Sequence, residues 1–168
     1  VVQALGPTDT LTETFTVSAA DGTTTTVVIT INGTNDTAVI SAGSGAVTED
    51  VGVVAGNLVT GGTLTVTDPD AGESSFQAQS TAGAYGSFTL GVDGVWSYTA
   101  SNANPAIQAL GRGDVLTETF SVRSADGTSS TVVVTINGTN DTAVVSADTG
   151  TVVEDGPLTT GGRLTITD

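Results

Sequence analysis

The chain contains no cysteine, histidine, lysine or methionine, and aromatic residues make up only 4% of it. Without cysteine there is neither a disulfide framework nor a thiolate site. Without histidine, cysteine or lysine, the commonest general bases and nucleophiles of enzymes are also missing. Paired carboxylates would still allow glycosidase-like acid chemistry, but the acidic motifs recur once in each repeat described below, beside the linkers. We therefore expect a protein that is not an enzyme.

Basic residues are almost as scarce. Three arginines, Arg112, Arg123 and Arg163, stand against 18 carboxylates, and the net charge is −15. Phosphate binding needs clustered lysine and arginine, so neither a nucleic acid nor an anionic membrane surface is an expected partner. The acidic side chains either form an ordinary solvated surface or include cation ligands, because unneutralised charge destabilises a compact state by self-repulsion. Composition alone leaves both interpretations open.

Long apolar runs are missing too. No segment approaches the length of a membrane span, so direct membrane insertion is not expected, and no signal peptide is recognisable. The chain has no initiator methionine and starts inside a repeated pattern, which leads us to expect a segment of a longer protein. A cysteine-free, acidic composition suits large bacterial exoproteins, and we expect a secreted protein at the extracellular cell surface.

Threonine, valine and glycine dominate the residues that are present. Threonine supplies about a fifth of the chain, and there are 22 glycines. Threonine and valine are β-branched and fit a pleated, half-buried surface better than a helix. Many short strands joined by tight turns are therefore predicted, as in an all-β sandwich with a thin core.

An internal repeat is the strongest signal in the sequence. Four segments recur at an offset of 105 residues: QAL (3–5 and 108–110), LTETF (11–15 and 116–120), ADG (20–22 and 125–127) and INGTNDTAV (31–39 and 136–144). Beyond a shorter counterpart of residues 51–58 that begins at Gly156, the offset is 100, and LTVTD at 64–68 recurs as LTITD at 164–168. A period near 100 residues fits one immunoglobulin- or cadherin-like β-sandwich domain.

This period divides the chain into three parts. Residues 1–36 form the C-terminal part of a preceding repeat, residues 37–141 a complete repeat, and residues 142–168 the N-terminal part of the next one. Both flanks lack the counterpart of residues 69–107. Half a sandwich exposes an unpaired edge and half a core, so we expect the flanks to be completed by other chains or to be weakly ordered.

Alternating apolar residues predict the strands of the complete repeat. They lie around Leu64 and Val66, at 75–80, 87–90 and 95–99, and in a final hairpin of 115–123 and 128–136. Residues 102–110 are the only helical candidate, with Asn104 as cap, Pro105 at the first position and Gly111 as the stop. Trp96 is expected in the core rather than at a ligand. Glu118 falls in phase with the apolar residues of its strand. This predicts an inward carboxylate that has a partner or lies where the end of the sandwich opens to solvent, or else a bulge that shifts the phase.

Strand direction groups the acidic residues at the two ends of the sandwich. The last strand ends at the linker to the next repeat, near 137–141, and its antiparallel partner starts at the same pole, at 114–118. Asp126 occupies the turn at the opposite pole, towards the preceding repeat. Each junction is therefore predicted to gather carboxylates from both sides of a short linker, and calcium takes six to eight such hard oxygen ligands.

Five stretches together resemble the VCBS repeat of giant bacterial surface proteins and RTX-type adhesins, within the cadherin-like, immunoglobulin-like sandwiches. They are VTED at 47–50, GTLTVTDPDAGE at 62–73, YGSFTLGVDGVWSYTASNANPAIQAL at 85–110, LTETFSVRSADGT at 116–128 and INGTNDTA at 136–143. The resemblance covers the whole chain and implies a calcium ion at each junction. The linker has fewer acids than the fuller cadherin pattern, which implies fewer ions per junction.

The same resemblance implies which residues bind calcium. At the first junction they are Asp9, Asn35, Asp36, Asp68, Asp70 and Asp126, and at the second they are Glu49, Asp50, Asp114, Asn140, Asp141 and Asp168. Asp68–Gly72 is also explained by a simple turn, because proline, aspartate and glycine all favour one.

Three functions remain as alternatives. The first is a calcium-stiffened stalk of neighbouring repeats in a protein of cell adhesion or biofilm. The second is a self-assembling filament or sheath, in which identical chains complete each other's strands. The third is a carbohydrate-binding module, which would need an exposed aromatic platform made from Tyr85, Trp96 and Tyr98.

Overall fold

The computed structural model describes residues 1–167, and strands are its main secondary structure. The strands are β1 (Thr10–Ser18), β2 (Thr24–Asn32), β3 (Val39–Ile40), β4 (Gly43–Thr48), β5 (Asn57–Thr63), β6 (Val66–Thr67), β7 (Gln79–Ala82), β8 (Gly86–Leu90), β9 (Val95–Ser101), β10 (Val115–Arg123), β11 (Ser129–Asn137), β12 (Val144–Val145) and β13 (Ile166–Thr167). A 3-10 helix spans Val2–Ala4, and the short helix α1 spans Pro105–Gln108. None of the helices in this described part is long and apolar enough to cross a membrane.

Two sheets form the central β-sandwich. One has the order β10-β11-β4 and the other β5-β9-β8-β7. Their inner faces meet in one core, where the rings of Phe88 and Phe120 stack with centroids 4.7 Å apart. The predicted all-β sandwich is confirmed. Its core comprises Val47, Leu58, Leu64, Phe76, Phe88, Leu90, Trp96, Tyr98, Ala100, Ile107, Phe120, Val122, Val132, Val134 and Ile136.

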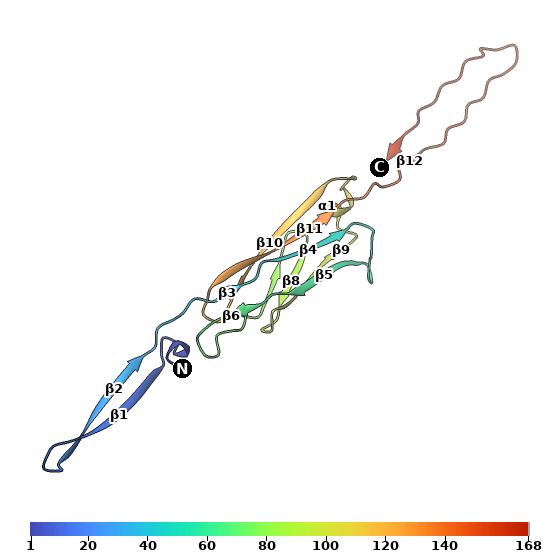
Figure 1. The fold of residues 1–168 in the computed structure, drawn as a ribbon. Coiled ribbons are helices and arrows are strands. Elements are labelled where there is room, and N and C mark those ends of the chain that lie inside the picture. Colours follow the sequence, from blue (N-terminus) through green and yellow to red (C-terminus); the bar gives the residue numbers. More distant parts are fainter. Residues whose placement is uncertain (168) are drawn as a thin grey trace.

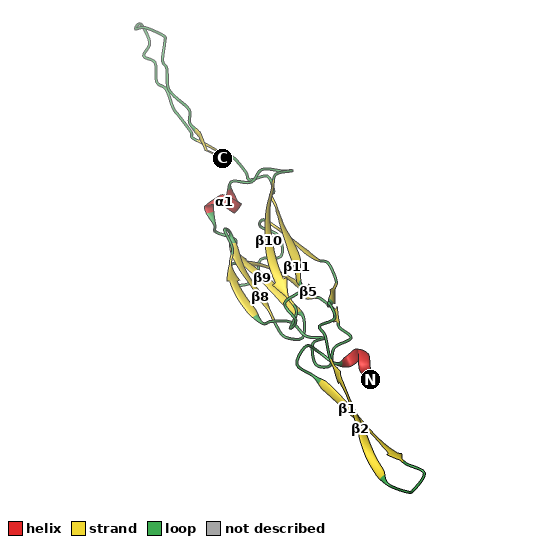
Figure 2. Ribbon diagram, turned by 90° about the vertical axis from the view of Figure 1, so that its left-hand side faces the viewer, coloured by secondary structure: helices red, strands yellow, loops and turns green. Residues whose placement is uncertain are grey.

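The flanking segments extend from opposite ends of this sandwich (Figures 1 and 2). β1 and β2 form a two-stranded hairpin beyond one pole, which we call the N-pole. Residues 142–167 form a long extended loop beyond the other, the C-pole, next to α1. The molecule is therefore elongated along the direction in which successive repeats follow each other.

The side chain of Glu118 on β10 points into the sandwich, and β10 contains no bulge. The β10–β11 register is continuous from Val115 opposite Asn137 to Arg123 opposite Ser129. Glu118 is buried and accepts hydrogen bonds from the amides of Ala84 and Tyr85 and from the Tyr98 hydroxyl. Burial of Tyr98 and its contact with Glu118 raise the pKa of the Tyr98 hydroxyl well above its usual range. The carboxylate therefore joins β10 of one sheet to β9 and the β7–β8 turn of the other.

Two strand predictions need correction. The strand expected at 75–80 is displaced to β7, because the amide of Phe76 bonds to Val92 and that of Gln77 to Arg123, so this segment crosses between the sheets. The strand expected around Leu64 is interrupted. The Leu64 amide bonds to Gly94, and the chain then leaves β9 to pair with β3 through β6. Within the expected helix, only Pro105–Gln108 is helical, and the Asn104 side chain caps it as predicted.

Trp96 lies in the core, as predicted, and glycines on two neighbouring strands make room for its ring. Its side chain is 3% exposed. A methyl group at Gly45 on β4 would lie 2.7 Å from the Trp96 ring, and one at Gly62 on β5 would lie 3.1 Å from Nε1. One glycine on β4 and one on β5 therefore follow from packing against this large ring.

We predict that Gly45→Ala lowers the free energy of unfolding by about 1–3 kcal/mol, because overpacking forces the indole and Thr60 to shift. Gly161→Ala is the matched control, since a methyl group there meets nothing within 4 Å. Urea unfolding followed by Trp96 fluorescence measures both variants. Equal stability of the two would contradict this packing role.

Candidate metal centres at the two poles

Two groups of carboxylates stand close enough together to hold a metal ion. Among the described residues these are Asp68, Asp70 and Glu73, the N-pole cluster, and Glu49, Asp50 and Asp141, the C-pole cluster. Within each cluster the ligand atoms all lie within 4.8 Å of one another. One cluster thus lies at each pole.

The N-pole cluster is built on the turn that follows β6. Asp68 accepts a hydrogen bond from the Asp70 amide at 2.9 Å through Oδ1, and the Asp68 amide donates one to Ser74 Oγ at 3.0 Å. The segment therefore forms a turn, as the alternative explanation of its sequence predicted. Oδ2 of Asp68 nevertheless remains buried without a partner, so the same residue can shape the turn and offer a ligand.

Asp70 connects this turn to the linker. It is 2% exposed, and its Oδ2 accepts a hydrogen bond from the Asp36 amide at 2.8 Å. Its Oδ1 is buried with no hydrogen-bond partner, as is Oε2 of Glu73. A buried, unpaired carboxylate oxygen is costly, and three of them converge in this cluster. Such a set fits a hard cation with oxygen ligands, as calcium is.

Electrostatics at the N-pole point the same way. Partial burial raises the pKa of Glu73, and the neighbouring carboxylates Asp70, Asp68, Asp126 and Asp9 raise it further. The sequence prediction missed Glu73 because it followed the alternate aspartates of the turn. The available signal was its position in the same turn, five residues after Asp68.

Asp126 is near this cluster but its oxygens are already used. It accepts hydrogen bonds from the Ser124 and Thr128 hydroxyls and from the amides of Thr128 and Ala38. Burial opposes its ionisation, but these hydrogen bonds outweigh that effect and hold the pKa of Asp126 well below its usual range. Asp126 therefore fastens the β10–β11 turn to the start of the repeat.

At the C-pole, Glu49 is a fully buried member of the cluster, and it also bonds to the chain just after β11. Its Oε2 accepts a hydrogen bond from the Thr139 amide at 3.1 Å, and its Oε1 has no partner. Asp50 has a positive φ of 56°, and its Oδ1 accepts hydrogen bonds from the side-chain amides of Asn102 at 2.6 Å and Gln108 at 3.3 Å. The α1 region thereby orients one of the cluster's carboxylates.

The other predicted ligands among residues 1–167 lie at the poles but outside the two clusters. Asp9 and Asp114 are exposed, and each accepts a hydrogen bond from the amide three residues before it. Asn35 and Asn140 each donate to the carbonyl of the following aspartate at 2.6 Å. Asp36 offers its amide to Asp70, and Asp168 lies outside the described residues.

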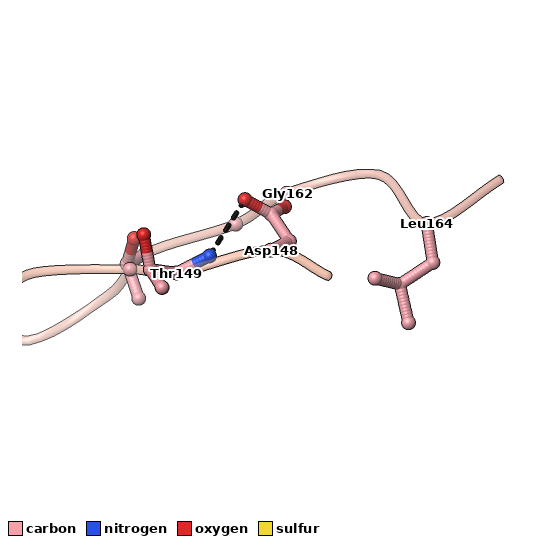
Figure 3. A pocket seen from close by; sticks show the side chains of 7 residues that line it. Asp148, Thr149, Gly162 and Leu164 are labelled. Carbon is pink, nitrogen blue, oxygen red and sulfur yellow. Dashed lines mark hydrogen bonds between the residues drawn. The ribbon is translucent and has the colours of Figure 1, made fainter. Parts of the chain in front are cut away.

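A hollow in the C-terminal segment has no comparable chemistry. It is lined by Asp148, Thr149, Gly150, Thr160, Gly161, Gly162 and Leu164 (Figure 3). Its one carboxylate accepts a hydrogen bond from the Thr149 amide at 2.8 Å. Three carboxylates do not meet there, so the candidate metal centres are those at the poles.

Comparison with known proteins agrees with this architecture. A family model described as a bacterial cadherin-like domain matches residues 35–138, which include the sandwich and most residues of both clusters. No curated protein matches the sequence. The cadherin-like part of the predicted resemblance is confirmed, and the narrower assignment to VCBS repeats stays a prediction.

We predict that Asp126→Asn lowers the melting temperature at pH 7 by about 5 °C, as expected for the loss of roughly 1 kcal/mol in a domain of this size. Because folding lowers the pKa of Asp126, the stabilisation by its ionised form is complete above about pH 4. It is lost as the pH falls further, through the folded-state pKa. The difference in melting temperature between the two proteins should therefore shrink below about pH 4. Thermal unfolding in chelator across pH 2–7 measures it, and a constant difference would contradict the assignment.

Proposed function

Because the chain belongs to the family of bacterial cadherin-like domains, we propose that it is part of a stalk of serial β-sandwich repeats stiffened by calcium. The stalk belongs to a secreted bacterial surface protein of the VCBS type and holds an adhesive or biofilm-forming region away from the cell. The proposal involves no catalytic step, in keeping with a family of structural domains.

The observation that carries this proposal is the bonding of Asp70. One of its oxygens is bonded across the linker to the Asp36 amide, and the other is buried and unpaired. A calcium ion held by Asp68, Asp70 and Glu73 would supply the missing partner for three buried oxygens. Because the linker is attached to the same carboxylate, an ion that orders Asp70 also restrains the junction.

Neutralisation of charge gives the ion a second effect. The chain carries a net charge of −15, and each cluster places three carboxylates within a few ångströms. Without a cation, their mutual repulsion favours opening of the junction. Calcium is therefore expected to stabilise the elongated form and its absence to loosen the hinges.

We predict that calcium at about 100 times its dissociation constant raises the free energy of unfolding by about 2.7 kcal/mol relative to chelator. The double variant Asp68→Asn, Asp70→Asn should lose most of this gain. The double variant Glu154→Gln, Asp155→Asn removes the same charge from a segment outside both clusters and should keep it. Circular dichroism melts with calcium and with chelator provide the measurement. An identical melting temperature in both solutions would refute the calcium proposal.

One observation favours a second candidate, self-assembly by strand complementation. Phe15 and Val27 of the β1–β2 hairpin are 49% and 46% exposed, whereas their counterparts Phe120 and Val132 are 5% and 0% exposed. In the complete repeat, β4 covers the free edge of β11 in parallel pairing. Residues 148–153 are the counterpart of β4, and those of a second copy would cover the corresponding edge of β2.

For this candidate we predict head-to-tail oligomers in sedimentation velocity experiments. Val152→Asp should dissociate them, because Val152 corresponds to the buried Val47. Val153→Asp is the matched control, since it corresponds to Thr48, which lies outside the core. A monomer at all accessible concentrations would rule out the filament and leave the stalk proposal intact. The carbohydrate-binding alternative has no such support, because Trp96 and Tyr98 are 3% and 0% exposed.

A further inference from the structure

The C-pole carries a hollow that has a filled counterpart at the N-pole. We call this hollow the junction seat. It has a volume of about 290 Å³ and is lined by Gln108, Ala109, Leu110, Gly111, Asn140 and Asp141. Each lining residue has an identical residue 105 positions earlier: Gln3, Ala4, Leu5, Gly6, Asn35 and Asp36. The chain therefore contains two copies of the seat.

The first copy is occupied by the acidic turn of the following repeat. The Ala4 carbonyl accepts a hydrogen bond from the Ala71 amide at 3.2 Å, and the Asp36 amide donates to Asp70 at 2.8 Å. Gly6 is buried, and a methyl group there would lie 3.4 Å from Oε1 of Glu73. A methyl group would make ordinary contact with Glu73 there, so Gly6 lies directly against the turn of the next repeat, and a larger side chain would meet that turn.

The second copy has the same local conformation without an occupant turn among the described residues. Gly111 donates to Asp114 at 3.1 Å just as Gly6 donates to Asp9 at 3.2 Å. The amides of Gly33 and Gly138 donate to the carbonyls of Asp9 and Asp114, both at 2.9 Å. The seat is therefore formed before anything binds it, which lowers the conformational cost of binding.

The chain also approaches both seats in the same way. Val39 pairs with Thr67 beside the first seat, and Val144 pairs with Thr167 beside the second. In each case a serine amide bonds to a threonine carbonyl at 2.9 Å, from Ser41 to Thr65 and from Ser146 to Thr165. Thr167 thus occupies at the second seat the position that Thr67 occupies at the first. A turn that follows Thr167 would start where residues 68–73 start at the first seat.

From these matches we infer that the junction seat is a docking surface for one occupant, an acidic turn like residues 68–73 at the head of the following repeat. Its specificity comes from the Ala109 carbonyl, the Asp141 amide and the open backbone at Gly111. The contact sets the orientation of successive repeats through direct hydrogen bonds. It rests on the serial-repeat part of the proposed function and needs no metal ion.

The filled seat provides the first test. In chelator, Gly6→Val should speed hydrogen exchange at the Ala71 amide at least tenfold, because the added side chain pushes away Glu73 and its turn. Gly111→Val is the matched control at the other pole, where the nearest atom to an added methyl group is Asp114 Oδ2 at 3.5 Å. It should leave Ala71 unchanged. Equal exchange at Ala71 in both variants would overturn the inference.

The second test fills the other seat. The full chain is extended after position 168 by a copy of residues 69–73, and exchange is again measured in chelator. We expect the Asp141 amide to exchange at least tenfold more slowly than in the unextended chain. The protection should be lost when the copy carries alanine in place of the aspartate that corresponds to Asp70, or when Gly111→Val is introduced. Unchanged exchange at Asp141 on extension would overturn the inference.

The two proposals can fail separately. Because both exchange experiments are made in chelator, absence of a calcium effect on melting would leave the docking result standing. A calcium-dependent rise in melting temperature without protection of Asp141 would support the stiffened stalk and refute the docking surface.

Discussion

The bond between the Asp36 amide and the Asp70 carboxylate links a repeat to the segment before it. It buries one end of a charged group at a hinge, and in doing so it leaves the other oxygen without a partner. A buried charge must be paired or must coordinate a cation. The same contact therefore holds the linker in place and leaves a buried carboxylate oxygen that the proposed calcium ion would pair, so metal binding would restrain the orientation of the linker at this position.

The flanks show what the sandwich contributes to strands of nearly the same sequence. LTETF is identical at 11–15 and 116–120, yet its phenylalanine is exposed in the hairpin and buried in the sandwich. Both copies form strands with the same antiparallel register. Local sequence is thus sufficient for the hairpin, while the apolar face gains a partner only when the second sheet is present.

Several features of the site were accessible from the sequence for clear physical reasons. The repeat offset and strand polarity placed acids at the two poles, and the helix cap at Asn104 followed from its position before proline. Glu73 was missed because only the folded turn brings its carboxylate close to those of Asp68 and Asp70. The strands β4 and β5 were also missed, since their glycines obscure the alternation, and the reason for Gly45 and Gly62 is the bulk of the Trp96 ring, which only the packing reveals.

The sequence by itself determined the all-β class, the period of the repeat and most of the acidic residues near each linker, because these depend on local composition and spacing. Tertiary structure decided which carboxylate oxygens are free. Both oxygens of Asp126 accept hydrogen bonds from its own turn and from Ala38, whereas Asp70 and Glu49 each keep one oxygen buried and unpaired. Some of the deciding hydrogen bonds join residues far apart in the chain, such as Ala38 with Asp126, Asp36 with Asp70 and Thr139 with Glu49. Spacing along the sequence cannot specify such pairings, because they depend on how the two sheets and the linker come together.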